Sequence, residues 1–433
     1  MSILHKPNHL NLQNWKIKTI SQLADTYAGG TPSRNVDGMF GGSIPWVKSA
    51  ELNQSEIIDT EEKLTEQGYH SSSAKRVPEN TPLIAMYGAT AGVVSWLKIR
   101  AVTNQAVLAV VPSNQETDAR WLYWILNFYS NKLIGMVQGS GQPNLNKSLI
   151  DELQVAQPLC CNEQRRIAEI LDTIDETIAL TSSLIAKLKQ IRAGLLQDLL
   201  TRGLDEDGKL RDAIAHPEQF QDSPLGRIPK DWEVRTCESV CKEIVVGIVI
   251  KPSQYYLPDG VPVMRSANVR EAGLNPSDLV FMSEQSNRLL AKSMIRTGDV
   301  LTVRTGYPGT SCVVPPEFDG ANCIDIIISR PTTEIKPEFL ATWINSDFGK
   351  CQVLRVQGGL AQQHFNVGQL QKLLLAKPPF EEQQAIQVRL NAHDTRLRTE
   401  EAYLNKLKLK KKGLMHDLLT GRVRVNTSEQ LSA

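Results

Sequence analysis

The chain has 433 residues, 41% of them hydrophobic, and a net charge of +1, so it is long enough for two to four ordinary globular domains and shows no strongly basic or acidic balance. No apolar run is long enough for a membrane span, and residues 1–14 lack the basic and apolar blocks of a signal peptide. The seven cysteines follow no disulfide framework, so we expect a cytoplasmic protein with reduced thiols, in which Cys237 and Cys241 are buried and bind no metal.

Residues 1–153 are predicted to form a first α+β domain. Alternating apolar residues and short β-rich runs bounded by Gly and Pro predict its strands, and the clusters of Gly, Ser and Asn predict its loops. The expected strands are 15–20, 44–48, 83–87 and 107–111, the expected helix is 121–127, and the expected loops are 29–34, 88–92 and 139–146.

Residues 154–203 are predicted to be a helical spacer with a long helix at 163–200. Its apolar residues step by alternating fours and threes, which is typical of a helix packed along another helix. These residues are Ile167, Leu171, Ile174, Ile178, Ile185, Leu188, Leu195 and Leu199, with Thr181 and Arg192 in the two remaining seam positions. At 1.5 Å per residue, such a helix is roughly 57 Å long.

Residues 204–224 form a turn-rich connector, and residues 225–373 form a second domain that repeats the order of the first. Residues 232–234 match the strand at Trp15, 251–254 match 31–34, 261–267 match 44–50, 300–306 match 82–88, and 339–345 match the short helix. Asn322 is expected at the place of Asn104. A shared framework with different residues at loop tips and strand ends is expected when one scaffold presents two different reading surfaces.

Residues 374–425 are predicted to be a second helical spacer, with a helix at 382–419 and a polar tail at 426–433. The ending GLMHDLLT at 413–420 repeats GLLQDLLT at 194–201, which indicates a duplication. The second seam consists of Ile386, Leu390, Leu397, Leu404, Leu407, Leu414 and Leu418. His393, Glu400 and Lys411 interrupt it, and they either weaken the pairing or specify its register. The two helices are expected to pack as an antiparallel coiled coil; the alternative is two unrelated surface helices.

Three segments resemble catalytic motifs, but each lacks a residue or a structural context that the motif requires. KPPF at 377–380 resembles the loop of amino-methyltransferases, but its lysine cannot accept the hydrogen bonds of a target amino group. GQPNLNKS at 141–148 lacks the second glycine of a P-loop and follows no buried strand. Glu61, Glu62 and Lys63 form part of a nuclease-like pattern, for which a charged turn is the simpler interpretation. These observations favour binding modules, with no catalytic residue and no metal site in this chain.

The chain resembles the specificity subunits of type I restriction-modification systems. The most characteristic segments are residues 194–203, GLD at 203–205, SPLGRIPKDW at 223–232, and residues 413–420. The resemblance implies two target recognition domains that each read one half of a split DNA site. It also implies that the helices separate the two domains and dock two methyltransferase subunits, and that restriction/translocase subunits join the complex. S-adenosylmethionine, ATP and Mg would belong to those partners, and this chain would hold no cofactor.

Two different readers imply an asymmetric site of double-stranded DNA, because a symmetric operator would need identical units. A rod of roughly 57 Å spans at most about 17 base pairs, so the unread gap should be shorter than that.

Candidate DNA-binding residues are donors and acceptors in the matched loops and strand ends, because Arg, Lys, Asn and Gln match base edges and phosphates. In the first domain they are Arg34, Lys48, Arg76, Tyr87, Gln142 and Asn144, and in the second domain Lys251, Arg265, Asn268, Arg304, Tyr307, Gln362 and Gln363. Trp15, Trp46 and Trp232 are expected in the core.

Two other functions stay open from the sequence. A stand-alone methyltransferase or nuclease with fused recognition domains would need catalytic motifs that the chain does not complete. A scaffold with two protein-binding modules would show no salt-dependent affinity for DNA, whereas a DNA reader loses affinity steeply with salt.

Overall fold

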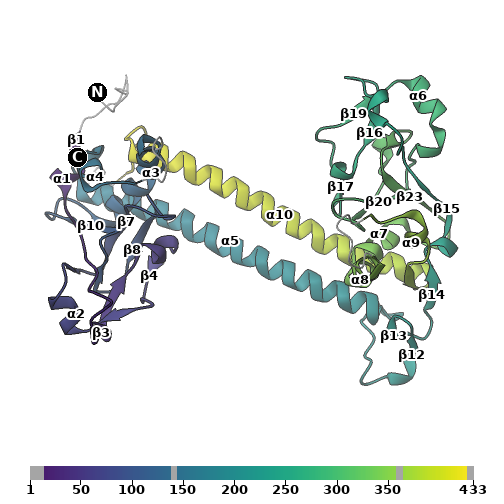
Figure 1. The fold of residues 1–433 in the computed structure, drawn as a ribbon, viewed down its shortest axis with the longest axis horizontal. Helices are drawn as coiled ribbons and strands as arrows, with labels where there is room; N and C mark the ends of the chain where they lie inside the picture. The colour runs from purple at the N-terminus through teal and green to yellow at the C-terminus, as the bar shows by residue number, and fades with distance from the viewer. Residues whose placement is uncertain (1–13, 138–143, 357–363, 427–433) are drawn as a thin grey trace. The chain divides into compact units, whose positions relative to one another are not determined.

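The structure is a computed structural model that describes residues 14–137, 144–356 and 364–426 (Figure 1). It has two compact units, which are residues 1–183 with 401–433, and residues 184–400. Two long helices, α5 (Cys161–Thr201) and α10 (Phe380–Leu419), each contribute one half to each unit (Figure 1). No helix in the described ranges has both the length and the apolar character needed to cross a membrane.

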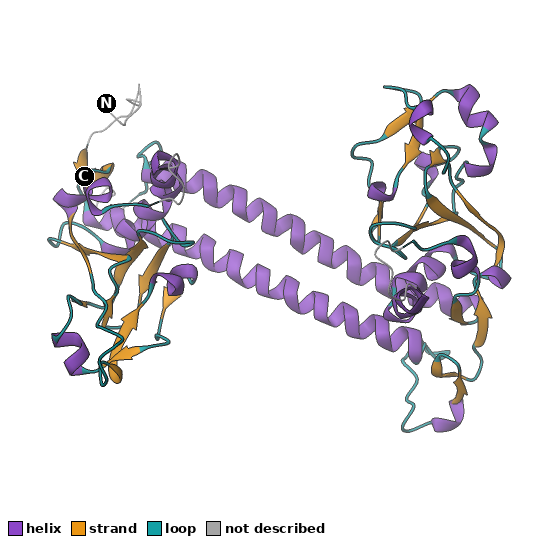
Figure 2. Cartoon of the chain, in the orientation of Figure 1, coloured by secondary structure: helices purple, strands orange, loops and turns teal. Residues whose placement is uncertain are grey.

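The first unit combines strands and helices, as expected for an α+β domain (Figure 2). Its strands are β1 (Trp15–Thr19), β2 (Ala24–Ala28), β3 (Phe40–Val47), β4 (Glu56–Ile57), β5 (Lys63–Leu64), β6 (Arg76–Val77), β7 (Thr81–Ala85), β8 (Val94–Leu97), β9 (Ala101–Thr103), β10 (Val107–Pro112) and β11 (Gln154–Pro158). Its other helices are α1 (Ile20–Leu23), α2 (Glu66–His70), α3 (Ala119–Val137) and α4 (Lys147–Asp151). The sheets have the orders β2-β10-β7-β8-β4, β5-β3-β9-β6 and β1-β11.

The second unit repeats this plan. Its strands are β12 (Phe220–Ser223), β13 (Gly226–Pro229), β14 (Glu233–Thr236), β15 (Cys241–Val246), β16 (Val261–Met264), β17 (Val269–Arg270), β18 (Gly273–Leu274), β19 (Val280–Met282), β20 (Val300–Val303), β21 (Ser311–Val313), β22 (Asn322–Cys323), β23 (Ile326–Pro331) and β24 (Leu374–Lys377). Its other helices are α6 (Glu284–Leu289), α7 (Pro337–Asn345), α8 (Asp347–Val356) and α9 (Val367–Gln371). The orders β15-β23-β20-β21, β19-β16-β22 and β14-β24 correspond to those of the first unit, so the duplication is confirmed at the level of topology.

Sheet register corrects one sequence match. In the first unit Val47 lies beside Thr103, and in the second unit Met264 lies beside Cys323, in parallel pairs. The residue after Thr103 therefore corresponds to Ile324, and the match of Asn104 with Asn322 was wrong. The error arose because Asn104 follows the short strand β9 while Asn322 begins the short strand β22, and these strands have no alternation long enough to fix their register.

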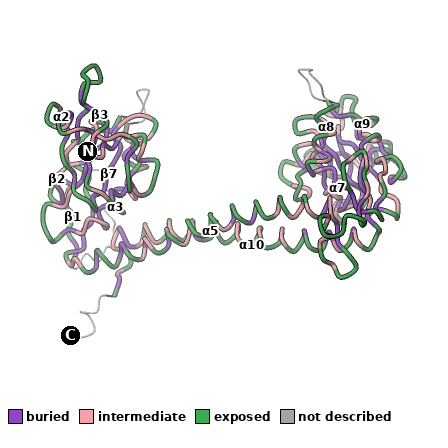
Figure 3. The backbone as a smooth tube through the Cα atoms, turned by 90° about the horizontal axis from the view of Figure 1, so that it is seen from below, coloured by how far each residue is buried: buried purple, intermediate pink, exposed green. Residues whose placement is uncertain are grey.

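The predicted seam is where the two long helices meet in each unit. All of the predicted seam residues are buried or half-buried, and Figure 3 shows such positions recurring along both helices. In the first unit, Ile167 and Leu171 share a core with Leu418 and with Trp121 of α3. In the second unit, Leu199 shares a core with Ile386, Leu390 and Phe339 of α7.

The direction of packing follows from the ion pairs between the helices. In the first unit, Glu163 near the start of α5 pairs with Arg424 beyond the end of α10, and Asp175 pairs with Lys411. In the second unit, Arg192 pairs with Asp394. The helices are therefore antiparallel in both units, as predicted, and the alternative of two unrelated surface helices is excluded.

A repeated glutamine joins each long helix to its sheet. Gln164 donates to the carbonyls of Pro158 and Glu116, both at 2.9 Å, and accepts from the Asp118 amide at 2.8 Å. Gln383 makes the same bonds to Pro378 at 2.9 Å, Glu334 at 3.1 Å and Lys336 at 2.8 Å. Both side chains are fully buried. Each glutamine thus fixes the end of the strand before the long helix and the segment that precedes α3 or α7.

Candidate nucleic-acid interface

Each unit presents the same turn at the carboxyl end of a parallel strand pair. The backbone amide of Lys48, after β3, donates to Oε2 of Glu51 at 2.8 Å, and the amide of Arg265, after β16, donates to Oδ1 of Asn268 at 2.9 Å. Gly29 and Gly247 approach the neighbouring strand at the same place, where a Cβ atom would lie 1.7 Å from the carbonyl oxygen of Thr103 and 2.5 Å from that of Cys323. The framework beneath both candidate surfaces is therefore common.

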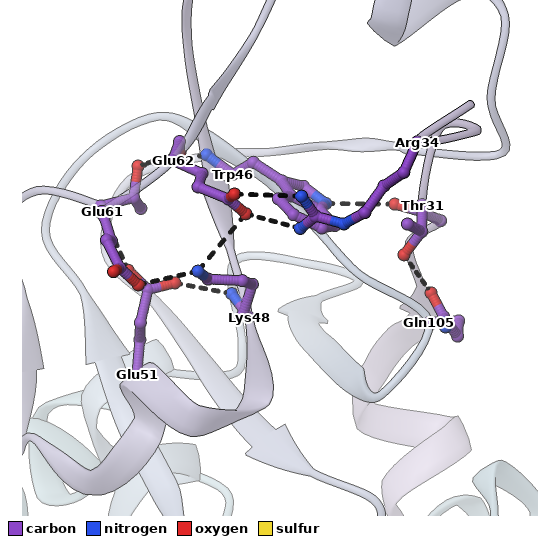
Figure 4. A network of polar contacts seen from close by, with 10 residues as sticks. Thr31, Arg34, Trp46, Lys48, Glu51, Glu61, Glu62 and Gln105 are labelled. Carbon is purple, nitrogen blue, oxygen red and sulfur yellow. Dashed lines mark hydrogen bonds and ion pairs between the residues drawn. The ribbon is translucent and has the colours of Figure 1, made fainter. Parts of the chain in front are cut away.

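In the first unit this place carries a network of charged side chains (Figure 4). Arg34 donates through Nη1 and Nη2 to the two oxygens of Glu62, at 3.2 and 2.8 Å. Its guanidinium lies over the ring of Phe40, 4.7 Å from the centroid, and 5.8 Å from that of Trp46. Lys48 places Nζ 2.8 Å from Glu61 and 3.3 Å from Glu62. The structure thus brings Arg34 and Lys48, both candidates from the sequence, into one cluster, together with carboxylates that the sequence analysis did not include among the candidates.

The hydrogen bonds of this network favour the charged forms of Lys48 and Glu62. The hydrogen bond from Arg34 lowers the pKa of the Glu62 carboxyl below its usual value. The hydrogen bond to Glu61 raises the pKa of the Lys48 ammonium. Two cations therefore face Glu51, Glu61 and Glu62, so the cluster is not an open basic patch for phosphates (Figure 4).

Trp46 and Thr31 support the same loop. Trp46 is buried and donates from Nε1 to the carbonyl of Gly30 at 3.1 Å, so it is a core residue as predicted. Thr31 donates to Oε1 of Gln105 at 2.5 Å (Figure 4). Gln105 follows β9, in the position that Asp325 occupies after β22 in the second unit.

The other candidates of the first unit lie in two places. Tyr87 follows β7, where the Leu145 amide donates to the Met86 carbonyl at 2.6 Å, so the loop of Tyr87 lies beside the segment of exposed Asn144. Partial burial raises the pKa of Tyr87. Arg76 is exposed and lies over the ring of Tyr69, 4.8 Å from its centroid. Gln142 lies outside the described residues.

In the second unit, Arg304 is held by its own neighbours. It forms an ion pair with Asp325 and donates from Nε to the carbonyl of Phe365 at 3.3 Å, and only 18% of its side chain is exposed. Thr305 lies 3.0 Å from Nδ1 of His364 in the same cluster. Arg304 therefore joins the loop after β20 to the segment before α9. Tyr307, in contrast, is 81% exposed at the tip of this loop.

Arg265 and Arg270 line a cavity of about 360 Å³ together with Asn275, Asp278 and Asp325. Arg265 also donates to the carbonyl of Asp278. Asp278 and Asp325 have φ values of +55° and +51°, a left-handed conformation that is strained for residues other than glycine and often found at functional sites. Arg265 is thus a good candidate, and Asp325, which the sequence match overlooked, belongs beside it.

Asn268 requires a correction. Its side chain is 1% exposed, accepts from the Arg265 amide, and donates to the carbonyls of Asn275 at 3.0 Å and Ser277 at 2.8 Å. Its hydrogen bonds close the turn, so we assign it a structural role and no DNA contact. Lys251 is exposed with a φ of +43°, and Gln362 and Gln363 lie outside the described residues.

Comparison with known proteins identifies relatives that are specificity subunits of type I restriction enzymes. Residues 13–190 match the family model of the type I restriction modification DNA specificity domain. The chain is 23% identical over 419 residues to the type I restriction enzyme MjaVIII specificity subunit of Methanocaldococcus jannaschii, which covers 95% of this chain and 94% of that protein. It is also 27% identical over 192 residues to the EcoR124I/EcoR124II specificity subunit of Escherichia coli, across 42% of this chain and 47% of that protein.

The fold has solved counterparts as well. The crystal structure of the S subunit of a type I restriction-modification system from M. genitalium matches with a TM-score of 0.58 at 16% identity, covering 96% of this chain and 98% of that one. At this level of identity the match supports the fold, with its two units and two long helices.

Proposed function

We propose that this chain belongs to the family of specificity subunits of type I restriction-modification systems, and that it reads DNA sequence for catalytic subunits that are separate chains. In this proposal the chain is no enzyme itself. Its two units are the sequence readers, and methylation and cleavage belong to the partner chains.

The observation that supports this proposal most directly is that the two units share the same supporting backbone but carry different side chains at the ends of its strands. The turn after β3 and β16, the close glycines, and the buried glutamines Gln164 and Gln383 are repeated. The side chains mounted on that framework differ: Lys48 and Gln105 in one unit correspond to Arg265 and Asp325 in the other. Two enzymes would repeat their catalytic residues, whereas two readers of different sequences should differ at these positions.

It follows that each unit reads one half of a split and asymmetric site on double-stranded DNA. The long helices α5 and α10, with 41 and 40 residues, would set the number of unread base pairs between the halves. The described tips carry both donors and acceptors, as direct readout of base edges requires.

The proposal extends to the complex. Two methyltransferase subunits, carrying S-adenosylmethionine, would dock on the helical spacers, and restriction/translocase subunits would bring ATP and Mg. The repeat supports two equivalent docking positions, because each unit contains one half of each helix in the same antiparallel arrangement.

The test is to co-express the chain with the methyltransferase encoded beside it and to map methylated adenines across the host genome. A split, asymmetric motif with a fixed gap is the expected result. A stable complex without a motif, combined with DNA affinity that does not depend on salt, would favour the protein scaffold instead.

A further inference from the structure

We propose that Arg34 and Glu62 act as one reading unit, matched to a single G·C base pair in the half-site of the first unit. This inference rests on the proposed function and names the base pair that one pair of side chains would select. Glu62 would be a specificity-determining residue that also positions Arg34.

The guanidinium of Arg34 is held in a fixed orientation but keeps one edge free. Its two terminal nitrogens bind the two oxygens of Glu62, and its plane rests on Phe40. The orientation of the guanidinium is thus fixed on two sides, while 57% of the side chain stays exposed. No residue in the described part of the chain accepts a hydrogen bond from Nε of Arg34, so the Nε–Nη2 edge remains available. That edge offers two parallel donors, which is the arrangement that binds O6 and N7 of guanine.

Glu62 keeps one site at which it can accept a further hydrogen bond. A carboxylate has about four lone-pair sites. Arg34 uses one site on each oxygen, and Lys48 approaches Oε2 at 3.3 Å. One site on Oε1 is therefore left, and the carboxylate stays ionised because the hydrogen bond from Arg34 lowers its pKa. A carboxylate oxygen can accept from the N4 amino group of cytosine. In the major groove of a G·C pair, this donor lies next to the guanine acceptors, so the pair of side chains matches both bases.

The second unit has different residues at the positions of Arg34 and Glu62. The Trp46 amide donates to the carbonyl of Glu62, and in the second unit Val263 pairs with Val280, which places Val280 where Glu62 lies. Gln254 corresponds to Arg34 by sequence. The backbone segments that carry Arg34 and Glu62, a turn before β3 and the residue before β5, thus have counterparts in the second unit, but the Arg–Glu pair has none. An exposed ion pair adds little to stability, so a role in holding the fold together does not account for it.

The test compares four forms of the chain, each co-expressed with the methyltransferase partner: wild type, Arg34→Lys, Glu62→Gln and the control Glu79→Gln. Arg34→Lys keeps the charge but removes the fork, and Glu62→Gln keeps the shape but replaces an acceptor with a donor. Glu79 is exposed in the same unit, so the control makes the same chemical change away from the pair. Adenine methylation is mapped for each form, and binding of the purified complexes is measured on duplexes changed at one base pair at a time.

We expect a G·C pair at one position of one half-site in the wild-type motif. Both variants should relax the preference at that same position, by roughly 5- to 150-fold. The gap and the other half-site should be unchanged, which also shows that the variants fold. Glu79→Gln should keep the wild-type motif.

The inference would be overturned by a wild-type motif with no G·C pair, by variants that keep the full preference, or by variants that relax different positions. If Arg34→Lys weakened binding equally on all duplexes and changed no base preference, Arg34 would be a phosphate contact and the inference would also fail. A wild-type complex without any split motif would refute the proposed function itself, and the two failures are therefore distinguishable.

Discussion

Arg192 on α5 forms an ion pair with Asp394 on α10, and Nη2 of Arg192 lies 3.0 Å from Oδ2 of Asp394. The repeat that aligns Gly194 with Gly413 also aligns Arg192 with Lys411 and Asp394 with Asp175. Lys411 and Asp175 form the corresponding ion pair in the other unit. Arg192 and Lys411, the two basic residues in the seams, thus each pair with an aspartate of the opposite helix, and the two ion pairs are copies of one interaction. The pairs favour the interpretation that these residues specify the register of the helices.

Reversal of the charges at this pair tests the role in register. Arg192→Asp should lower the free energy of unfolding by about 1 kcal/mol, because both side chains are only half-buried. The addition of Asp394→Arg should restore most of the loss. Urea unfolding monitored by circular dichroism measures both effects. The control is the same reversal at Arg288 and Glu284, an exposed pair that should contribute almost nothing. A double variant no more stable than the single one would contradict this role.

Glu382 should be among the most sensitive positions of the second unit. It accepts from Arg211 at 2.7 Å, from the Leu204 amide at 2.6 Å and from Nε1 of Trp232 at 3.0 Å, and its side chain is buried. Glu382→Ala leaves the buried Arg211 guanidinium with only the exposed carboxylate of Asp231, and leaves the Leu204 amide and the Trp232 Nε1 without this acceptor, so we expect a loss of about 3 kcal/mol.

Amide hydrogen exchange of residues 203–232 measures the loss in Glu382→Ala, because the hydrogen bonds of Glu382 to Leu204, Arg211 and Trp232 hold this segment in place. Glu381→Ala, at the exposed neighbouring position, is the matched control. Equal exchange rates in both variants would show that Glu382 does not anchor the connector.

Arg304→Ala distinguishes the two interpretations of that residue. As a guanine reader, Arg304 would matter only with DNA bound. The structure instead predicts faster hydrogen exchange around residues 304–310 and 364–366 in the DNA-free chain, because the bonds to Asp325 and Phe365 are lost. Tyr307→Ala, at the exposed tip of the same loop, should leave exchange in the free chain unchanged. Unaltered exchange in Arg304→Ala would restore the reader interpretation.

Alkaline pH should destabilise the second unit through its buried thiols. Burial raises the pKa of Cys312 from 9.0 to about 12. The unfolded chain therefore releases this proton at a lower pH than the folded chain, and stability falls as pH rises from about 9 toward 12. The slope is at most about 1.4 kcal/mol per pH unit.

Urea unfolding at several pH values, with Cys312→Ala for comparison, measures this slope. The variant should show a shallower loss of stability above pH 9. Labelling with a thiol reagent at pH 8 should modify the exposed Cys351 in the folded chain, and Cys312 only after unfolding. An identical slope in wild type and variant would exclude Cys312 as the source.

Ile178→Pro should separate the folding of the helices from their proposed role in assembly. Ile178 is half-buried in the interior of α5, and proline there costs about 3 kcal/mol or more. We expect the methyltransferase partner to be lost when the variant is purified. Glu176→Ala, at an exposed position one half-turn away, should retain it. Full co-purification with Ile178→Pro would show that the seam is not the docking element.

The sequence alone determined the features that depend on periodicity and repetition. Heptad spacing predicted the long helices at 163–200 and 382–419, and the structure extends them only to Cys161–Thr201 and Phe380–Leu419. The repeated endings predicted two similar units, because a duplicated segment that cannot bury its own seam must pack against its copy. Local alternation also sufficed for the strand at Trp15, and a short apolar run sufficed for the strand at Val107.

Only the tertiary structure decided which side chains are available at the candidate surface. Asn268 and Arg304 belong to types that read bases, but one closes a turn and the other holds a neighbouring loop. Glu62 is an ordinary acidic residue in the sequence, and its significance comes from Arg34, which lies 28 positions away. Hydrogen-bond partners far apart in the chain leave no periodic signal, so their pairing follows from the fold and not from local pattern.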